Sequence, residues 1–307
     1  MERGTEHQTE RGTEHPTARG DAPTLDVQNL TIGYETESGI LPAVRGVSFS
    51  LDRRKSLGLV GESGSGKSTL AMGTLRYLAF NGRILGGRIL LSGVDMLGLS
   101  ARELRRIWGA RVGMIYQNPQ TALNPSLPVG RQLAEMAELH LGLSGGSARD
   151  EIHRMLRKVA MPDPESVFRR FPHQLSGGMI QRCVIAMALM TNPELLVMDE
   201  PTTALDVTTQ AVVLDLVADL KRDFDSSIFY ITHDLAVVAR ICDQIGVMYA
   251  GEMMELGDTE EIYSRPLHPY TWKLLGCTPR FEEGRRRSRL SGIPGYIPRL
   301  DELPGGC

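Results

Sequence analysis

Short runs of apolar residues alternate with longer stretches in which apolar positions recur every three or four residues, starting near Leu25. The short runs predict β-strands, and the stretches with helical spacing predict α-helices. The predicted strands cover residues 25–32, 44–51, 56–61, 112–116, 195–198, 228–231 and 245–249. The predicted helices cover residues 68–78, 101–108, 129–141, 148–159, 178–190 and 270–275. This alternation predicts an α/β fold with a mostly parallel sheet.

Three stretches depart from the alternation. Residues 120–185 have helical spacing but little strand pattern, so we expect a helical insertion there. Residues 1–23 contain ERGTEHQT followed by ERGTEHPT, which lack aliphatic and aromatic side chains, so we expect a disordered tail. Metal binding by His7 and His15 is the alternative for that tail. After residue 264 the chain is rich in Pro, Gly and Arg, which divides it into 1–23, a domain over 24–264 and an extension over 265–307.

Composition narrows the class of protein. A chain of 307 residues with 41% hydrophobic and 23% charged residues has room for one large domain and an appendage. The net charge of −3 provides no overall basic field for nucleic acid. Cys183, Cys242, Cys277 and Cys307 are far apart in the sequence, which favours reduced thiols over a disulfide framework. No apolar run approaches the roughly 20 residues of a membrane helix, so we expect a soluble chain that meets membranes through a partner.

Residues 61–69 read GESGSGKST, which fits the G-x4-G-K-[ST] pattern of a phosphate-binding loop. A predicted strand ends at this loop and a predicted helix begins in it. This context favours a phosphate-binding loop over the alternative, a flexible glycine turn. Glycines let backbone N–H groups approach phosphates, and the helix N-terminus attracts the anion. We expect Lys67 to contact the β- and γ-phosphates of ATP and Ser68 to bind Mg²⁺. The candidate nucleotide ligands are Gly61, Ser63, Gly64, Gly66, Lys67, Ser68 and Thr69.

Two adjacent carboxylates, Asp199 and Glu200, end the apolar strand predicted over 195–198. Burying charge is costly unless a partner is present, and a bound cation supplies one. We expect Asp199 to hold Mg²⁺ and Glu200 to deprotonate the attacking water. The alternative, a simple cap for the following helix, is disfavoured because a phosphate loop precedes this pair in the sequence.

The segment 175–179, LSGGM, precedes a predicted helix and closely resembles the signature of ABC ATPases. The resemblance covers about residues 25–264. It implies an α/β fold: a P-loop NTPase (RecA-like) core with an N-terminal antiparallel β subdomain and a helical signature subdomain. It also implies that Ser176, Gly177 and Gly178 bind the nucleotide held by a second subunit. Met179 stands where the family usually has glutamine, a departure that is frequent in the oligopeptide importer branch.

The remaining family motifs follow in the expected order. Gln117 matches the Q-loop glutamine, which the family uses to sense Mg²⁺ and the attacking water. Asp206, in Ala204-Leu205-Asp206, matches the loop that crosses the dimer interface. His233 matches the switch histidine at the γ-phosphate, and Tyr34 matches the aromatic residue that stacks on adenine. A surface histidine and a strand-edge tyrosine are the alternatives for these two. The complete set implies an active ATPase.

Finer features indicate the branch of the family. The chain has one phosphate loop, one signature, no sustained heptads and no fused membrane helix, which disfavours DNA-repair, translation and exporter types. Residues 117–125, 171–175, 267–271 and 292–307 resemble the oligopeptide, dipeptide and nickel importer group. Peptides are therefore the expected solute. Nickel or another small solute is the first alternative, and a non-transport ATPase acting on nucleic acid is the second.

The resemblance also implies the partners. These are a second ABC ATPase subunit, with a paralogue favoured, two transmembrane permease subunits and, indirectly, an extracytoplasmic solute-binding protein, with no nucleic acid. Such a subunit lies peripherally at the cytoplasmic face of the plasma (inner) membrane. The cluster Arg285–Arg287 with Arg289 reads as a solvated face or as a contact to acidic lipid headgroups. Some relatives continue past Cys307 with cysteines that hold an iron–sulfur cluster, so we expect a short variant or a fragment that cannot complete one.

Overall fold

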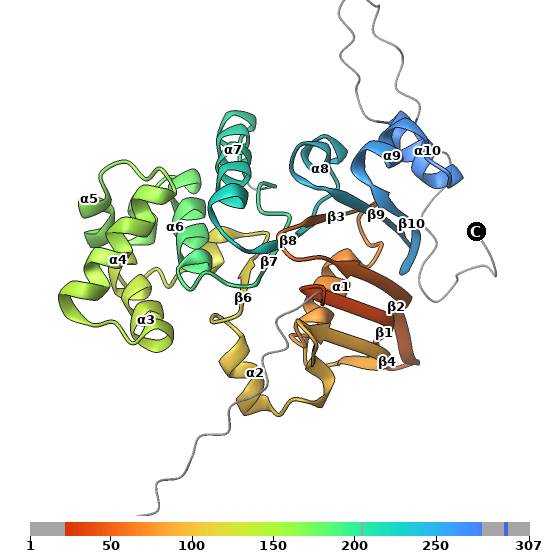
Figure 1. Ribbon diagram of the computed structural model, residues 1–307, viewed down its shortest axis with the longest axis horizontal. Coiled ribbons are helices and arrows are strands. Elements are labelled where there is room, and N and C mark those ends of the chain that lie inside the picture. Colours follow the sequence, from red (N-terminus) through yellow and green to blue (C-terminus); the bar gives the residue numbers. More distant parts are fainter. Residues whose placement is uncertain (1–21, 204, 278–291, 294–307) are drawn as a thin grey trace, which may run out of the picture.

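The computed structural model describes residues 22–203, 205–277 and 292–293. Two β-sheets and a group of helices make up this part of the chain (Figure 1). The N-terminal repeat, the arginine cluster at 285–289 and Cys307 lie outside the described residues.

The first sheet is antiparallel and has the order β2-β1-β4-β5. Its strands are β1 (Leu25–Thr36), β2 (Gly39–Leu51), β4 (Gly82–Leu91) and β5 (Val94–Asp95). In β1, Leu25 and Val27 point inward, and after a register shift Leu30 and Ile32 do so again. Asn29 in this bulge has φ +47°. The bulge returns the apolar side chains to the buried face of the sheet.

The second sheet has the order β10-β9-β3-β8-β7-β6, with β10 antiparallel to β9 and all other pairs parallel. Its strands are β3 (Ser56–Val60), β6 (Val112–Ile115), β7 (Leu195–Asp199), β8 (Ser227–Ile231), β9 (Gln244–Tyr249) and β10 (Glu252–Asp258). Every residue of β3, β7 and β8 is buried, as expected for parallel strands covered on both faces. The predicted mostly parallel α/β sheet is confirmed.

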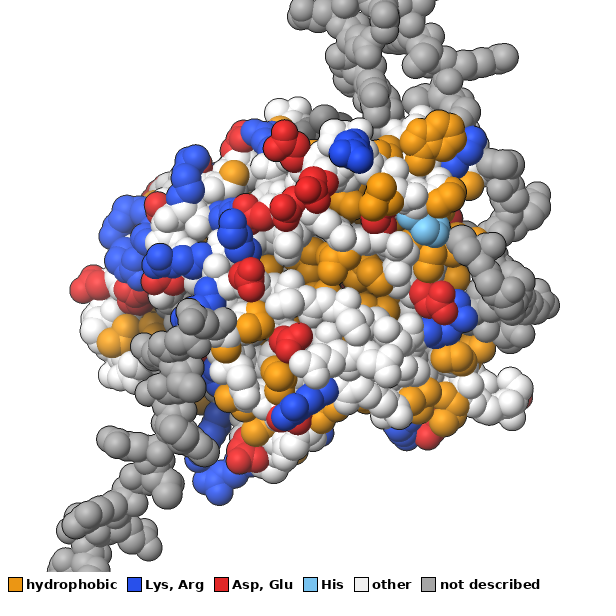
Figure 2. All heavy atoms as spheres, turned by 45° about the vertical axis from the view of Figure 1, so that its right-hand side comes forward, with side chains coloured by type: hydrophobic (Ala, Val, Ile, Leu, Met, Phe, Trp, Pro, Cys, Tyr) orange, Lys and Arg blue, Asp and Glu red, His pale blue; other side chains and the backbone are white. Residues whose placement is uncertain are grey.

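The helices are α1 (Lys67–Thr74), α2 (Ala101–Ile107), α3 (Val129–Leu141), α4 (Gly145–Lys158), α5 (Pro164–Arg169), α6 (Gly177–Leu189), α7 (Val207–Asp223), α8 (Leu235–Ile241), α9 (Thr259–Ser264) and α10 (Pro269–Gly276). Short 3₁₀ turns are η1 (Met96–Gly98), η2 (Pro119–Thr121) and η3 (Pro172–Gln174). Helices α3 to α6 pack together beside the parallel sheet, at the left in Figure 1. Basic side chains gather over this side of the molecule in Figure 2. The antiparallel sheet, the parallel core and this helical unit confirm the predicted fold class.

Helix α1 is shorter than the sequence pattern predicts and ends at Thr74 rather than near residue 78. Arg76 has φ +53°, and the N–H of Tyr77 donates to the carbonyl of Met72. A left-handed residue followed by such a backward hydrogen bond is a common helix end. The backbone, rather than a loss of apolar spacing, therefore stops this helix.

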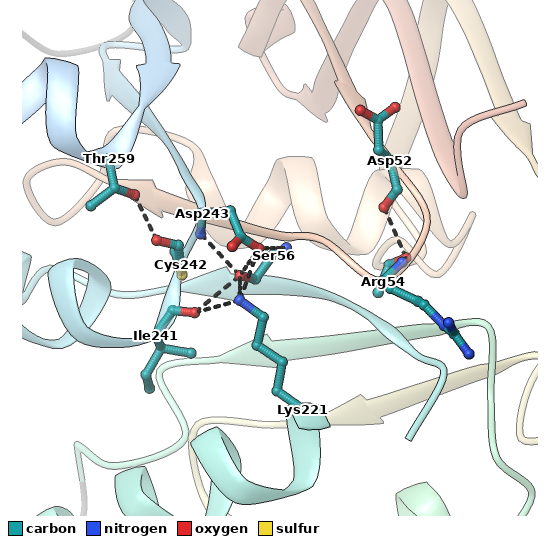
Figure 3. A network of polar contacts seen from close by, with 9 residues as sticks. Asp52, Arg54, Ser56, Lys221, Ile241, Cys242, Asp243 and Thr259 are labelled. Atoms are coloured by element: carbon teal, nitrogen blue, oxygen red, sulfur yellow. Dashed lines mark hydrogen bonds and ion pairs between the residues drawn. The ribbon is translucent and has the colours of Figure 1, made fainter. Parts of the chain in front are cut away.

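The amino-terminal edge of the parallel sheet is held by a polar network (Figure 3). Lys221, in the last turn of α7, donates to Ser56 Oγ at 2.7 Å and to Asp243 Oδ2 at 2.8 Å. The N–H of Ser56 donates to the same carboxylate at 2.8 Å. Burial raises the pKa of Asp243, but the hydrogen bonds from Lys221 and Ser56 outweigh it, so the pKa is lowered overall. The network joins α7 to the starts of β3 and β9, at the opposite edge from the phosphate loop.

No helix in the described part of the chain has both the length and the apolar character needed to cross a membrane.

Candidate functional site

The phosphate loop joins the end of β3 to the start of α1 and depends on glycine at two positions. A Cβ atom on Gly61 would lie 2.1 Å from the carbonyl oxygen of Met248, and one on Gly66 would lie 2.5 Å from that of Ala43. Gly66 also has φ +95° and precedes α1 directly. Helix α1 has no side-chain cap and no acidic residue in its first turn. Its N-terminus therefore offers N–H groups and a positive partial charge to an anion.

Lys67 is folded back over the loop and is only 5% exposed. Its Nζ donates to the carbonyl oxygens of Gly61 and Glu62, each at 2.8 Å. Burial lowers the pKa of Lys67, and the negative charges of Glu200 and Asp199 partly oppose that change. An ammonium group that hydrogen-bonds loop carbonyls can exchange these partners for phosphate oxygens.

Asp199 ends β7 and lies next to the start of α1. Its Oδ1 accepts a hydrogen bond from Ser68 Oγ at 3.0 Å. Asp199 is 6% exposed, and this burial raises the pKa of its carboxyl group. A hydroxyl and a buried carboxylate in contact are oxygen ligands of the kind that Mg²⁺ prefers. The donor set therefore fits a magnesium ion, which would also compensate the buried charge.

Glu200 contacts residues that follow the two strands beside β7. Its backbone has φ +44°, and its N–H donates to the carbonyl of Ile231 at 2.9 Å. Its carboxylate accepts from Gln117 Nε2 at 3.2 Å and lies 3.2 Å from His233 Nδ1. These two residues follow β6 and β8, the neighbours of β7 in the sheet. The structure thus brings together three residues that the sequence analysis identified separately.

Thr203 is a contact that the sequence analysis did not identify. Its Oγ1 donates to Glu200 Oε2 at 3.0 Å, so it fixes the same oxygen that Gln117 contacts. The signal in the sequence is a hydroxyl residue three positions after the glutamate, which can turn back onto the carboxylate.

Tyr34 lies on β1 beside the start of α1. Its hydroxyl is 3.1 Å from Thr69 Oγ1, and a Cβ on Gly82 would meet its ring at 3.3 Å. The antiparallel sheet thereby places an aromatic ring next to the phosphate loop. Stacking on adenine stays a prediction.

The signature residues form a separate group. Ser176 caps α6 by accepting from the N–H of Met179 at 3.3 Å. A Cβ on Gly178 would lie 2.6 Å from Thr209 Cγ2, so α6 and α7 approach closely here. Asp206 caps α7, and hydrogen bonds from Thr209 lower its pKa. Ala204 lies outside the described residues.

Within the described ranges, no hydrogen bond or ion pair joins Ser176, Gly177 or Gly178 to the phosphate loop. Asp206 likewise bonds only within its own turn there. One chain therefore presents two unconnected sets of candidate ligands, one around Lys67 and one around Ser176.

Comparison with known families identifies the family of this chain. A family model described as ABC transporter matches residues 44–203, and one described as the C-terminal region of oligopeptide/dipeptide transporters matches residues 254–307. The chain belongs to the ABC transporter family. It is an ATP-binding subunit of the oligopeptide/dipeptide group, as the sequence resemblance predicted.

Relatives of this ABC subunit share almost half of its residues. It is 45% identical to the oligopeptide transport ATP-binding protein OppD of Bacillus subtilis, over 92% of this chain and 79% of the relative. It is 46% identical to the dipeptide transport ATP-binding protein DppD of the same organism, over 92% of this chain and 84% of the relative. OppD of Escherichia coli is also 46% identical, over 92% of this chain and 83% of the relative.

Solved structures agree on the fold of the ABC subunit. The dimeric bacterial ABC transporter cassette MJ0796 has a TM-score of 0.67 and 26% identity, and the match covers 76% of this chain and 98% of that one. The protein cbiO1 of Clostridium perfringens has a TM-score of 0.68 and 25% identity, with 80% and 92% covered. These likenesses confirm the ABC ATPase fold. The predicted domain boundaries at 23 and 264 and the roles of individual residues stay predictions.

Proposed function

We propose that this chain hydrolyses MgATP at Glu200 when it is paired with a second ABC ATPase subunit, and that hydrolysis drives peptide import through a membrane permease. The observation that carries the proposal is the carboxylate of Glu200, which Gln117, Thr203 and His233 hold beside the phosphate loop. The names of the relatives, which are oligopeptide and dipeptide transport proteins, support peptides as the solute.

The residues divide the chemistry between them. Lys67 and the start of α1 would bind the phosphates, and Ser68, Asp199 and Gln117 would hold the metal ion. When bound there, Mg²⁺ would supply positive charge to the phosphate oxygens. Glu200 accepts a proton from the attacking water, and its three contacts fix the carboxylate that does so. His233 Nδ1 lies 3.2 Å from Glu200. A contact between His233 and the γ-phosphate would therefore affect the position of that carboxylate.

The second set of ligands serves a partner subunit. Ser176, Gly177 and Gly178 open the 13-residue helix α6, whose N-terminus suits an anion. Because this set makes no contact with its own phosphate loop in the described residues, it is available to the nucleotide bound by the partner. Asp206 would lie at the same interface. The resemblance favours a paralogue as that partner.

An apolar groove supplies the docking place for the permease. Its volume is about 300 Å³, and it is bordered by the ends of α1 and α6 and by β6. Tyr77, Trp108 and Met187 lie in its wall, and Tyr77 is 53% exposed. Gln117 follows the groove residue Tyr116 directly, so an occupant would lie one residue from a contact of Glu200. A short cytoplasmic helix of a permease fits these properties, as helices dock into apolar grooves.

A subunit docked in this way would lie peripherally at the cytoplasmic face of the plasma (inner) membrane. Two permease subunits would bind two ATPase subunits, and an extracytoplasmic binding protein would deliver the solute. Nickel or another small solute is the alternative cargo of the same group.

The test is ATP turnover by the full complex reconstituted in vesicles with its permeases, its second ATPase and its binding protein. Peptide-loaded binding protein should stimulate turnover and uptake, and the Glu200→Gln variant of this chain should abolish both. Stimulation by nickel alone would show that nickel, rather than a peptide, is the solute. Stimulation of the chain by DNA or ribosomes, with none by the permeases, would contradict transport.

A further inference from the structure

The C-terminal helix α10 places one side chain against the phosphate loop. The backbone N–H of Glu62, the second residue of the loop, donates to the hydroxyl oxygen of Tyr270 at 3.3 Å. The carbonyl of the same residue accepts from Lys67 Nζ at 2.8 Å. Glu62 is therefore held from two sides, by the nucleotide-binding lysine through its carbonyl and by α10 through its amide.

The sheet register explains why these groups meet. Val60 at the end of β3 pairs with Val247 in the parallel strand β9. Glu62 and Tyr249 each lie two residues further along the chain, so they reach the same level at this end of the sheet. The rings of Tyr249 and Tyr270 pack with their centroids 4.8 Å apart. Figure 1 shows α9 and α10 side by side at the β9–β10 end of the sheet.

Hydrogen bonds hold the turn before α10 and thereby fix the backbone position of Tyr270. The carboxylate of Glu255 on β10 accepts from the N–H groups of Leu267 and His268, at 2.7 and 3.0 Å. The Nδ1 of His268 accepts from the N–H of Tyr270 at 3.1 Å and caps α10. The LHPYT segment at 267–271, which the family motifs of the ATP site do not include, thus connects β10 to the phosphate loop.

We propose that Tyr270 is a positioning residue for nucleotide binding, whose hydroxyl fixes the Glu62 peptide and thereby the orientation of the loop N–H groups. The inference rests on the nucleotide site proposed above and adds to it a group from the C-terminal extension. Without this contact the loop samples more conformations, and ordering it then costs part of the binding free energy. Within the described residues, no hydrogen bond joins Tyr270 to Ser68, Asp199 or Glu200, so it affects binding of the nucleotide rather than the chemical step.

The test compares two variants of the full chain that each lose one phenol hydroxyl. Tyr270→Phe removes the contact to Glu62. Tyr263→Phe removes a hydroxyl that donates to the carbonyl of Leu235, away from the loop. Titration with MgATP should show a Kd raised about two- to tenfold in Tyr270→Phe, which corresponds to one hydrogen bond. The Kd of Tyr263→Phe should stay at the wild-type value. In the assembled complex, KM for ATP should rise in parallel for Tyr270→Phe, while kcat at saturating ATP is retained.

An unchanged Kd in Tyr270→Phe, or an equal change in both variants, would overturn the inference. So would a lowered kcat with an unchanged KM. The Lys67→Ala variant separates this failure from a failure of the site. If Lys67→Ala loses MgATP affinity and Tyr270→Phe does not, only the inference is wrong. If Lys67→Ala binds MgATP as the wild type does, the proposed nucleotide site is wrong.

Discussion

The Oε1 atom of Glu200 lies 3.2 Å from Nδ1 of His233, although 33 positions separate the two residues. Strands β7 and β8 are parallel neighbours, so the residues that follow them leave the sheet at the same edge. The contact is made by a carboxylate that is 17% exposed and an imidazole that is 58% exposed. Glu200 is therefore held in the site while His233 remains open to a ligand or a partner.

Replacing Glu200 by glutamine should lower ATP turnover by about 10² to 10⁴, the range for loss of a general base. The amide keeps the shape of the side chain and its contact with Thr203, so MgATP affinity should be retained. Turnover by the complex and titration of the isolated variant measure the two effects. Glu138→Gln, on the exposed face of α3, is the control and should turn over ATP normally. A Glu200→Gln variant with wild-type turnover would remove Glu200 from the chemistry.

Asp199→Asn should stabilise the metal-free protein at neutral pH. Burial raises the pKa of Asp199, so its contribution to stability is present when it is protonated and is lost as pH rises through the folded-state pKa. The difference in unfolding free energy between variant and wild type should therefore shrink as the solution is acidified. Denaturant unfolding over a pH series without metal measures this difference.

The same pair of proteins tests the metal site. Adding Mg²⁺ with ATP should stabilise the wild type more than Asp199→Asn, because the variant lacks the charged ligand. Equal stabilisation of both proteins would show that Asp199 does not hold the ion.

Lys221→Met should destabilise the protein by about 1 to 2 kcal/mol, because Ser56 and Asp243 lose a charged donor in a partly exposed network. The pKa of Asp243 is lowered in the folded protein, so the stability it provides is lost as pH falls through that pKa. The penalty of Lys221→Met should therefore diminish in acid. MgATP affinity should not change, since the network lies at the other edge of the sheet. A lowered affinity with normal stability would contradict the structural role of the network.

The sequence patterns marked the candidate site residues more clearly than they marked the outlying elements, for physical reasons. The phosphate loop and Asp199-Glu200 are short local patterns that follow buried strands. Patterns of this kind can be recognised from the sequence alone. The pattern did not reveal β4, β5, β10, α5, α7, α8 or α9. Strand β4 carries adjacent glycines, Gly86 and Gly87, which interrupt its apolar pattern, and only Ile89 and Leu91 are buried in it. Helix α7 begins with β-branched and polar residues that dilute its apolar spacing.

Met179 shows how a departure from a family pattern can be harmless to local structure. Ser176 accepts its hydrogen bond from the backbone N–H of residue 179, so the cap of α6 does not depend on the side chain there. The Tyr270–Glu62 contact is the opposite case. It joins residues 208 positions apart in the sequence, and only the tertiary structure reveals it.

In the proposed pair of subunits, each ATP needs the signature of the other subunit. The direct measurement is Ser176→Arg in this chain, with Ser100→Arg as the matched control because Ser100 also caps a helix, α2. Ser176→Arg should lower turnover by the complex at least about tenfold, as loss of an anion-stabilising group does, while MgATP affinity of the isolated chain stays at the wild-type value. Ser100→Arg should leave both unchanged. Unchanged turnover in Ser176→Arg, or a parallel loss of MgATP affinity in the isolated chain, would contradict a role of Ser176 at the ATP of the other subunit.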